Sequence, residues 1–179
     1  MRQCIRRWLT CWALLLALAC SSPEPQPPAP APLPEHPVRI ISLAPSITEI
    51  LFALNLDERI VGVTQFCNYP PAATERTSVG GYYNPNYEAM IALKPDLVIL
   101  LREHTREREH FDSLGVPWLE VNHHSIAKIF ASMETIGQAT GSRERAKRLI
   151  ADLKTKLEKI GHRTKNLPRP KVQIGRAHV

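Results

Sequence analysis

The sequence predicts an α/β fold in which helices flank a mainly parallel sheet. Between residues 38 and 142, short apolar runs alternate with segments whose apolar residues recur at helical spacing. The runs at residues 40–43 and 97–101 are almost continuously apolar, which is typical of strands covered on both faces. Strands that alternate with helices in this way favour parallel pairing, because each helix carries the chain back to the start of the next strand.

The first strand and helix lie in residues 39–56, RIISLAPSITEILFALNL. Pro45 ends the strand, because proline has no N–H for a sheet hydrogen bond. Ser46 stands three residues before Glu49, which is the spacing of a capping box and predicts the start of a helix. Ligands often bind at such strand-to-helix junctions in open α/β sheets, but these residues alone leave a purely structural role open. The apolar face of this helix is predicted to comprise Ile47, Ile50, Leu51 and Leu54.

The remaining elements follow from the same criteria. Residues 65–86 contain Pro-Pro and Gly-Gly pairs and therefore predict an irregular loop. Phe111 and Leu114 are the expected inward contacts of a helix that ends at Gly115. We expect strands at residues 60–64, 97–101 and 117–121, helices at residues 87–93, 106–114, 125–140 and 143–161, and the start of a further strand at residues 172–174.

Residues 1–20 have the pattern of an export signal peptide. Three arginines precede an apolar segment that is too short to span a bilayer comfortably. Cys20 follows Ala19, and the junction resembles the lipobox of bacterial lipoproteins, although Ala17 replaces the leucine that this pattern prefers. The resemblance implies that acylated Cys20 anchors the protein to the periplasmic, or more generally extracytoplasmic, face of a membrane; which membrane stays open. Ordinary signal cleavage is the alternative.

Residues 21–37 predict a linker between this signal and the folded part. Eight prolines between positions 23 and 37 favour an extended polyproline conformation and prevent the formation of a core. A semi-rigid spacer would hold a folded lobe away from a membrane. The alternative is a proline-rich ligand for an SH3-type domain.

The C-terminal residues 174–179, IGRAHV, match the translation of a common sequencing-adapter read. We therefore expect that the gene continues beyond about residue 173 and that residues 166–173 begin a second lobe. A genuine short C-terminus is the alternative. Such an artefact would carry no information about the fold.

The charge is distributed unevenly along the chain. The formal net charge is +6, yet residues 38–142 hold fewer basic than acidic residues, and the excess of positive charge lies at the two ends. A nucleic-acid-binding domain concentrates basic residues on its folded face, so this pattern argues against nucleic acid as a partner. Cys67 is the single cysteine of residues 21–179, which excludes an internal disulfide there and favours a small buried side chain.

The order of motifs resembles the periplasmic substrate-binding proteins of ABC importers for cobalamin, haem and ferric siderophores. The similarity rests on the first strand and helix, on GVTQFCNYPPAA and on VGGYYNPNYEAMIALKPDLVI, and it covers residues 38–165. CNYPP and GGYYNPN are most similar to the cobalamin-binding branch. The resemblance implies two α/β lobes joined by a long helix, here residues 143–165, with residues 38–142 as the N-terminal lobe and the C-terminal lobe missing.

The same resemblance implies where ligand and partner bind. Glu88 matches a surface glutamate that docks onto the ABC permease in the inner membrane, whereas a lone exposed carboxylate is ordinarily only solvated. The ligand cleft is expected where the strands end, and aromatic rings there suit a flat macrocycle. A tyrosine packed beneath its own loop, or an arginine in a solvated run, is the structural alternative. The candidate ligand-binding residues are Pro45, Ser46, Phe66, Tyr82, Tyr83 and Arg102, with Gln65, Glu103 and residues 122–124 beside them.

The leading hypothesis is therefore a non-enzymatic, monomeric lipoprotein that binds a metal chelate, cobalamin first, then haem or a ferric siderophore, with no intrinsic cofactor. A direct zinc or manganese receptor would need several histidines to converge. An exported α/β hydrolase would need an activated nucleophile, and GxSxG does not occur in the sequence. An adhesion lipoprotein stays open if no ligand binds. The histidines considered for a metal site are His104, His110, His123 and His124, of which adjacent His123 and His124 should point apart on a strand.

Overall fold

The computed structural model describes residues 31–171. Its five strands form one sheet in the order β3-β2-β1-β4-β5, and every neighbouring pair is parallel. The predicted α/β class and parallel sheet are therefore confirmed. The predicted signal peptide with Cys20, the first part of the linker, and residues 172–179 with the expected strand and tail lie outside the described residues.

The elements follow the predicted order closely. The strands are β1 (Ile40–Ser42), β2 (Ile60–Val63), β3 (Thr77–Ser78), β4 (Leu97–Leu101) and β5 (Trp118–Val121). The α-helices are α2 (Pro45–Ala53), α3 (Tyr87–Ala92), α4 (Thr105–Leu114), α5 (Ile126–Ala139) and α6 (Arg143–Thr164), and two 3₁₀ turns are η1 (Asp57–Arg59) and η2 (Pro71–Glu75).

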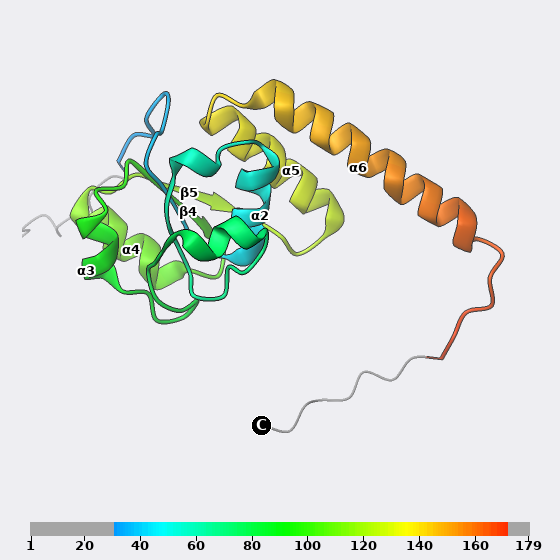
Figure 1. Ribbon diagram of the computed structural model, residues 1–179, viewed down its shortest axis with the longest axis horizontal. Helices are drawn as coiled ribbons and strands as arrows, with labels where there is room; N and C mark the ends of the chain where they lie inside the picture. Colours follow the sequence, from blue (N-terminus) through cyan, green and yellow to red (C-terminus); the bar gives the residue numbers. More distant parts are fainter. Residues whose placement is uncertain (1–30, 172–179) are drawn as a thin grey trace, which may run out of the picture.

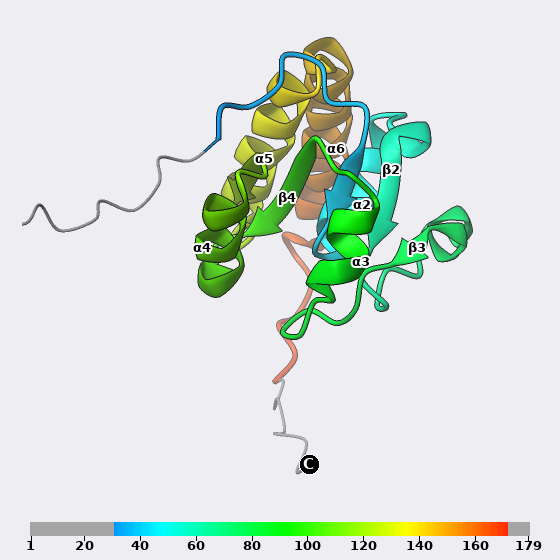
Figure 2. The same cartoon turned by 90° about the vertical axis from the view of Figure 1, so that its left-hand side faces the viewer.

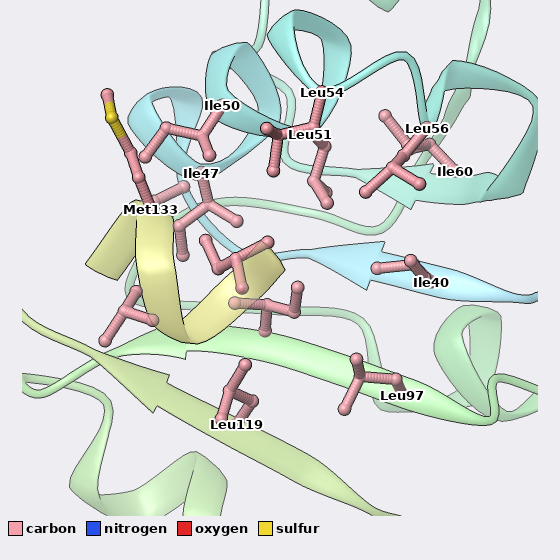
Figure 3. Close-up of a cluster of buried hydrophobic side chains, with 14 of the residues drawn as sticks. Ile40, Ile47, Ile50, Leu51, Leu54, Leu56, Ile60, Leu97, Leu119 and Met133 are labelled. Atoms are coloured by element: carbon pink, nitrogen blue, oxygen red, sulfur yellow. The ribbon is translucent and has the colours of Figure 1, made fainter. Parts of the chain in front are cut away.

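Two helical layers cover the sheet, one on each face (Figures 1 and 2). Alternate residues of each strand point to opposite faces. In β4, Leu97 and Ile99 join a core under α2, α5 and α6, whereas Val98 and Leu100 join a second core under α3 and α4. Figure 3 shows the first core, in which α2 contributes the predicted apolar face. Its buried members include Ile47, Ile50, Leu51 and Leu54, as predicted.

The predicted capping box is wrong. Helix α2 begins at Pro45, so Ala44 is the N-cap residue and Ser46 already lies within the first turn. Proline suits the first helical position, since the N–H that it lacks would have no partner there. The cap makes no side-chain hydrogen bond, and the Ser46 hydroxyl is free to contact another element.

Two further predictions need correction. The segment predicted to be an irregular loop, residues 65–86, contains η2 and the two-residue strand β3. Its proline and glycine pairs indicated only a loop. Leu114 was predicted to face inward, but it is 44% exposed, and Phe111 alone carries the inward contact of this pair. Gly115, at φ 64°, ends α4 as expected.

A chain of buried polar side chains fixes the start of α2 against β1 and β2. Thr48 Oγ1 donates to Ser42 Oγ over 2.8 Å and lies 3.2 Å from the Cys67 sulfur. Thr64 Oγ1 is also 3.2 Å from that sulfur. Cys67 is buried, as predicted, and its small side chain packs among these polar groups.

The long helix α6 is attached to the lobe only through its first half. Gly137 of α5 lets the two helices approach so closely that an added Cβ would lie 2.5 Å from the Cβ of Ala146. Beyond Leu153, the residues of α6 are exposed, and the helix projects away from the lobe (Figure 1). Leu157 and Ile160 lie in this projecting part and are exposed. Among residues 31–171, no helix combines the length and apolarity needed to cross a membrane.

The contact between Gly137 and Ala146 generates a stability prediction. Replacing Gly137 with valine should lower the free energy of unfolding by about 1–3 kcal/mol, because the side chain would overpack the crossing of α5 and α6. The control is Gly161→Ala, where a new Cβ meets open space and should stabilise the helix by about 0.5–1 kcal/mol. Urea unfolding followed by circular dichroism measures both; an unchanged midpoint for Gly137→Val would contradict the proposed close packing.

Candidate functional site

The carboxyl ends of all five strands meet at one edge of the sheet. Because every pair is parallel, the loop that follows each strand begins at this edge. Four spacings between neighbouring strands make the edge roughly 19 Å long, at about 4.8 Å per spacing. The edge therefore gathers the residues that the sequence nominated: Pro45 and Ser46 after β1, Gln65 and Phe66 after β2, Tyr82 and Tyr83 after β3, Arg102 and Glu103 after β4, and residues 122–124 after β5.

The loop after β3 crosses the edge towards β4. The rings of Tyr82 and His104 lie 4.5 Å apart, and the ring of Tyr83 meets Tyr82 edge to face at 4.6 Å. His104 is buried, its Nδ1 accepts from the Leu101 N–H at 3.1 Å, and its Nε2 lies 3.2 Å from the Tyr82 carbonyl oxygen. An imidazole that accepts at Nδ1 carries its proton at Nε2, so His104 donates to that carbonyl. His104 is thus a brace that holds the tyrosine loop in place.

Three aromatic side chains at this edge are exposed to water. Tyr83 is 86% exposed, Phe66 is 54% exposed and Tyr69 is 64% exposed. Two of the three, Tyr83 and Phe66, were predicted from the sequence. Large apolar rings held at a rim by their loops offer contact area for a ligand at little cost in side-chain entropy.

Tyr82 combines a packed ring with a polar end. Burial raises the pKa of the Tyr82 phenol above its usual value, and the carboxylate of nearby Glu103 adds to the effect. The hydroxyl therefore stays protonated at neutral pH and can donate to an acceptor on a ligand.

Ser46 and His123 join the ends of β1 and β5. Ser46 Oγ lies 2.8 Å from His123 Nδ1, although the two residues are 77 positions apart in the sequence. The other ring nitrogen, Nε2, is buried and has no hydrogen-bond partner among the described residues. Burial lowers the pKa of His123 below its usual 6.5, and the Glu103 carboxylate opposes this effect without cancelling it. The imidazole is therefore neutral at pH 7.

A groove of about 540 Å³ opens beside this pair, between α2, α5 and the first half of α6. Ser46, His123 and Tyr69 stand among its lining residues, and the rest of its wall is mostly aliphatic. The groove thus extends the strand edge with an apolar surface. Its other lining residues are Glu49, Ile50, Ala53, Ile129, Met133, Leu149 and Leu153.

Among residues 31–171, the polar side chains at the end of β4 include one that contacts His124 and one that has no ion-pair partner. His124 Nε2 lies 2.7 Å from Glu103 Oε1. Arg102 is exposed, and within residues 31–171 its side chain forms no ion pair. A guanidinium in this position can donate to a carboxylate or phosphate on a ligand.

The four histidines that were considered for a metal site lie in different environments. His104 braces the tyrosine loop, His110 packs on Tyr87 with ring centres 4.0 Å apart, and His123 and His124 contact Ser46 and Glu103. Within the described residues, no three His, Cys, Asp or Glu side chains gather closely enough to hold a metal ion.

Glu88 lies in the first turn of α3, and its side chain is exposed. The Asn86 side chain caps this helix by accepting from the Ala89 N–H over 3.0 Å. Since α3 follows β3, its first turn lies near the same edge as the tyrosine loop. The Glu88 carboxylate is thus presented to solvent beside the loop after β3.

Sequence reasoning missed two residues of this site. Tyr69 was passed over within the irregular segment, although a tyrosine flanked by Asn68 and Pro70 is a rim aromatic in a loop. The bracing role of His104 was also missed, because His104 was considered as a candidate metal ligand and not as a partner of the tyrosine loop. No periodic pattern links His104 with Tyr82, so this contact could not be inferred from spacing.

Comparison with known proteins places this geometry in a family. Residues 40–177 match a family described as "Periplasmic binding protein". An uncharacterized ABC transporter substrate-binding lipoprotein of Bacillus subtilis (strain 168) is 34% identical over 138 residues, which cover 74% of this chain and 44% of that protein.

Two solved structures share the fold. The periplasmic vitamin B12-binding protein of Vibrio cholerae superposes with a TM-score of 0.68 at 28% identity, over 74% of this chain and 53% of that one. A periplasmic haem-binding protein of Roseiflexus sp. RS-1 in its apo form also gives a TM-score of 0.68, at 29% identity, over 74% and 52% of the two chains. The chain spans about half the length of the relatives it matches. Because the family match at residues 40–177 covers well over half of the chain, the chain belongs to the periplasmic binding protein family.

Proposed function

We propose that this chain forms one lobe of a protein that captures a metal chelate, cobalamin foremost, and delivers it to a membrane permease. The observation that carries the proposal is the group of exposed aromatic rings, Phe66, Tyr69 and Tyr83, at the edge where all strands end. Exposed rings at a fixed rim suit the flat face of a macrocycle. The similarity to a vitamin B12-binding protein and the cobalamin-like CNYPP and GGYYNPN segments support this choice of ligand.

In this proposal the lobe supplies one wall of a cleft, and a second lobe supplies the other. Pro45 and Ser46 form the middle of the wall, because β1 is the central strand. The rings of Phe66, Tyr82 and Tyr83 would contact the face of the macrocycle. Arg102, whose side chain has no ion-pair partner among residues 31–171, would meet an acidic substituent.

A hydrolytic role is less well supported. Ser46 and His123 form the pair that a hydrolase would need, but a third group must orient the histidine. Glu103 contacts His124 instead, and His123 Nε2 has no hydrogen-bond partner within the described part of the chain. The relatives reported above are binding proteins, which agrees with a non-enzymatic function.

Delivery would depend on groups outside the cleft. Exposed Glu88 would dock onto basic residues of the permease, as the family resemblance implies. Acylated Cys20 would keep the protein at the extracytoplasmic face of the membrane, and the similar lipoprotein of Bacillus subtilis supports such an anchor.

Calorimetric titration of the whole mature protein tests the choice of ligand. We expect tight binding of cyanocobalamin, with hemin and ferric siderophores as comparison ligands and zinc chloride as the test of direct metal binding. Tyr83→Ala and Phe66→Ala should each lower the affinity about tenfold, since each removes roughly 1.4 kcal/mol of ring contact. Leu114→Ala, which shortens an exposed side chain at the far end of α4, should leave the affinity unchanged. Tight zinc binding without binding of any chelate would refute the proposal.

Glu88→Ala separates docking from ligand binding. Uptake of the chelate through the permease should fall severalfold, because the carboxylate would no longer meet a basic partner, while the affinity for the chelate stays constant. The control is Glu134→Ala, which removes an exposed carboxylate from α5. A loss of ligand affinity in Glu88→Ala would instead make Glu88 part of the cleft.

The lowered pKa of His123 predicts that the free energy of unfolding depends on pH. Its pKa in the folded lobe is below the value of about 6.5 in the unfolded chain, so the unfolded state binds the proton more strongly. Stability should therefore fall as the pH drops through 6.5 and level off below the folded-state pKa. His123→Gln should reduce the loss of the urea midpoint between pH 7.5 and pH 5.5, whereas His162→Gln, at an exposed site on α6, should not. An identical pH profile for His123→Gln and the unaltered protein would count against this assignment.

A further inference from the structure

A polar hollow of about 230 Å³ lies between the loop after β2 and the segment that leads from η2 into β3. Its lining includes a single charged side chain, Arg76, and no described acidic residue. The polar groups around Arg76 belong to Gln65, Asn68, Thr74 and Ser78. The composition is that of a site for a negatively charged group.

Arg76 differs from four other arginines of the lobe, whose guanidinium groups have partners within the chain. Arg39, Arg59 and Arg145 donate to backbone carbonyl oxygens, and Arg108 pairs with a glutamate. Arg76 Nε is buried and has no hydrogen-bond partner among the described residues, and its guanidinium forms no ion pair with any of them. A guanidinium carries five N–H donors and no acceptor, so only an acceptor can satisfy the buried Nε–H.

The backbone on both sides of Arg76 is held firmly. Ala73 in η2 and Val79 after β3 are fully buried, and the Arg76 N–H donates to the Ala73 carbonyl over 3.2 Å. Ser78 pairs with Val63 in the register of β2 and β3. The guanidinium is thus carried by a fixed segment and not by a free loop.

The neutral donors around Arg76 can be identified from the hydrogen bonds already made. The Thr74 hydroxyl donates to the Pro71 carbonyl over 2.7 Å and cannot also donate to a ligand. The Ser78 hydroxyl and the amide groups of Gln65 and Asn68 remain available on the exposed side of the hollow. Together with the planar fork of Arg76, they match the oxygens of a carboxylate or phosphate.

We propose that this hollow is an oxyanion-binding site in which Arg76 is the charged anchor and Ser78, Gln65 and Asn68 are neutral donors. Gln65 precedes Phe66 in the chain and Asn68 follows it by two residues, so the site adjoins the loop that carries this exposed ring. The oxyanion is either an acidic substituent of the bound chelate, a source that rests on the proposed function, or a free phosphate-like anion. Both sources present the same chemistry to Arg76.

Titration of the whole protein with inorganic phosphate tests the site without any chelate. Arg76→Gln should weaken phosphate binding at least tenfold, and Arg76→Lys, which keeps the charge but loses the fork, should give an intermediate loss. Arg163→Gln removes the same charge from the exposed end of α6 and should leave phosphate binding unchanged. Thermal unfolding of each variant establishes that it is folded.

A second pair of titrations distinguishes the two sources. Cyanocobalamin carries a phosphodiester that dicyanocobinamide lacks, and hemin carries two carboxylates that its dimethyl ester lacks. If the chelate supplies the oxyanion, Arg76→Gln should weaken binding of the acidic member of a pair and leave the other unchanged. If phosphate binding alone is lost, the anion is free. Equal binding of phosphate and of every chelate by Arg76→Gln and the unaltered protein overturns the site, whereas failure of all chelates to bind overturns only the proposed function.

Discussion

The parallel pairing of β1 with both β2 and β4 is the constraint from which the rest of the lobe follows. A central strand must be covered on both faces, and α2, α5 and α6 cover one face while α3 and α4 cover the other. Parallel strands also leave the sheet at the same edge. The burial of apolar strands therefore brings together five loops that have little in common in sequence, and it does so without any interaction with a ligand.

Pro45 shows how a local backbone rule shapes the edge. By occupying the first helical position, it moves the N-cap to Ala44 and places Ser46 inside the first turn. A serine that capped the helix would have its hydroxyl turned to the helix backbone. Here the hydroxyl reaches His123 instead, which links the loops after β1 and β5 across the strand between them. Ser46, which the sequence indicated as a helix cap, therefore makes a contact between distant segments instead.

Most of the fold could be predicted because its signals are local. The apolar run of β4 and the helical spacing of α5, with its Ser125 cap, depend only on neighbouring residues. β3 escaped prediction because a two-residue strand between η2 and the tyrosine loop has no periodicity to detect. Topology places the candidate residues of the site together at one edge of the sheet, but the contacts of His104 with Tyr82 and of His123 with Ser46 join residues far apart in the sequence. Such pairs depend on how the loops pack, and this sequence on its own carries no signal for them.

The attachment of α6 has a mechanical consequence. The helix is 22 residues long, or about 33 Å, and roughly half of that length extends beyond its last contacts with the lobe. The helix is therefore anchored at one end only, where Gly137 of α5 and Ala146 of α6 cross closely. A small change in the crossing angle displaces each later residue of α6 in proportion to its distance from the crossing. The close contact of Gly137 and Ala146 therefore determines the direction in which the projecting half of α6 points.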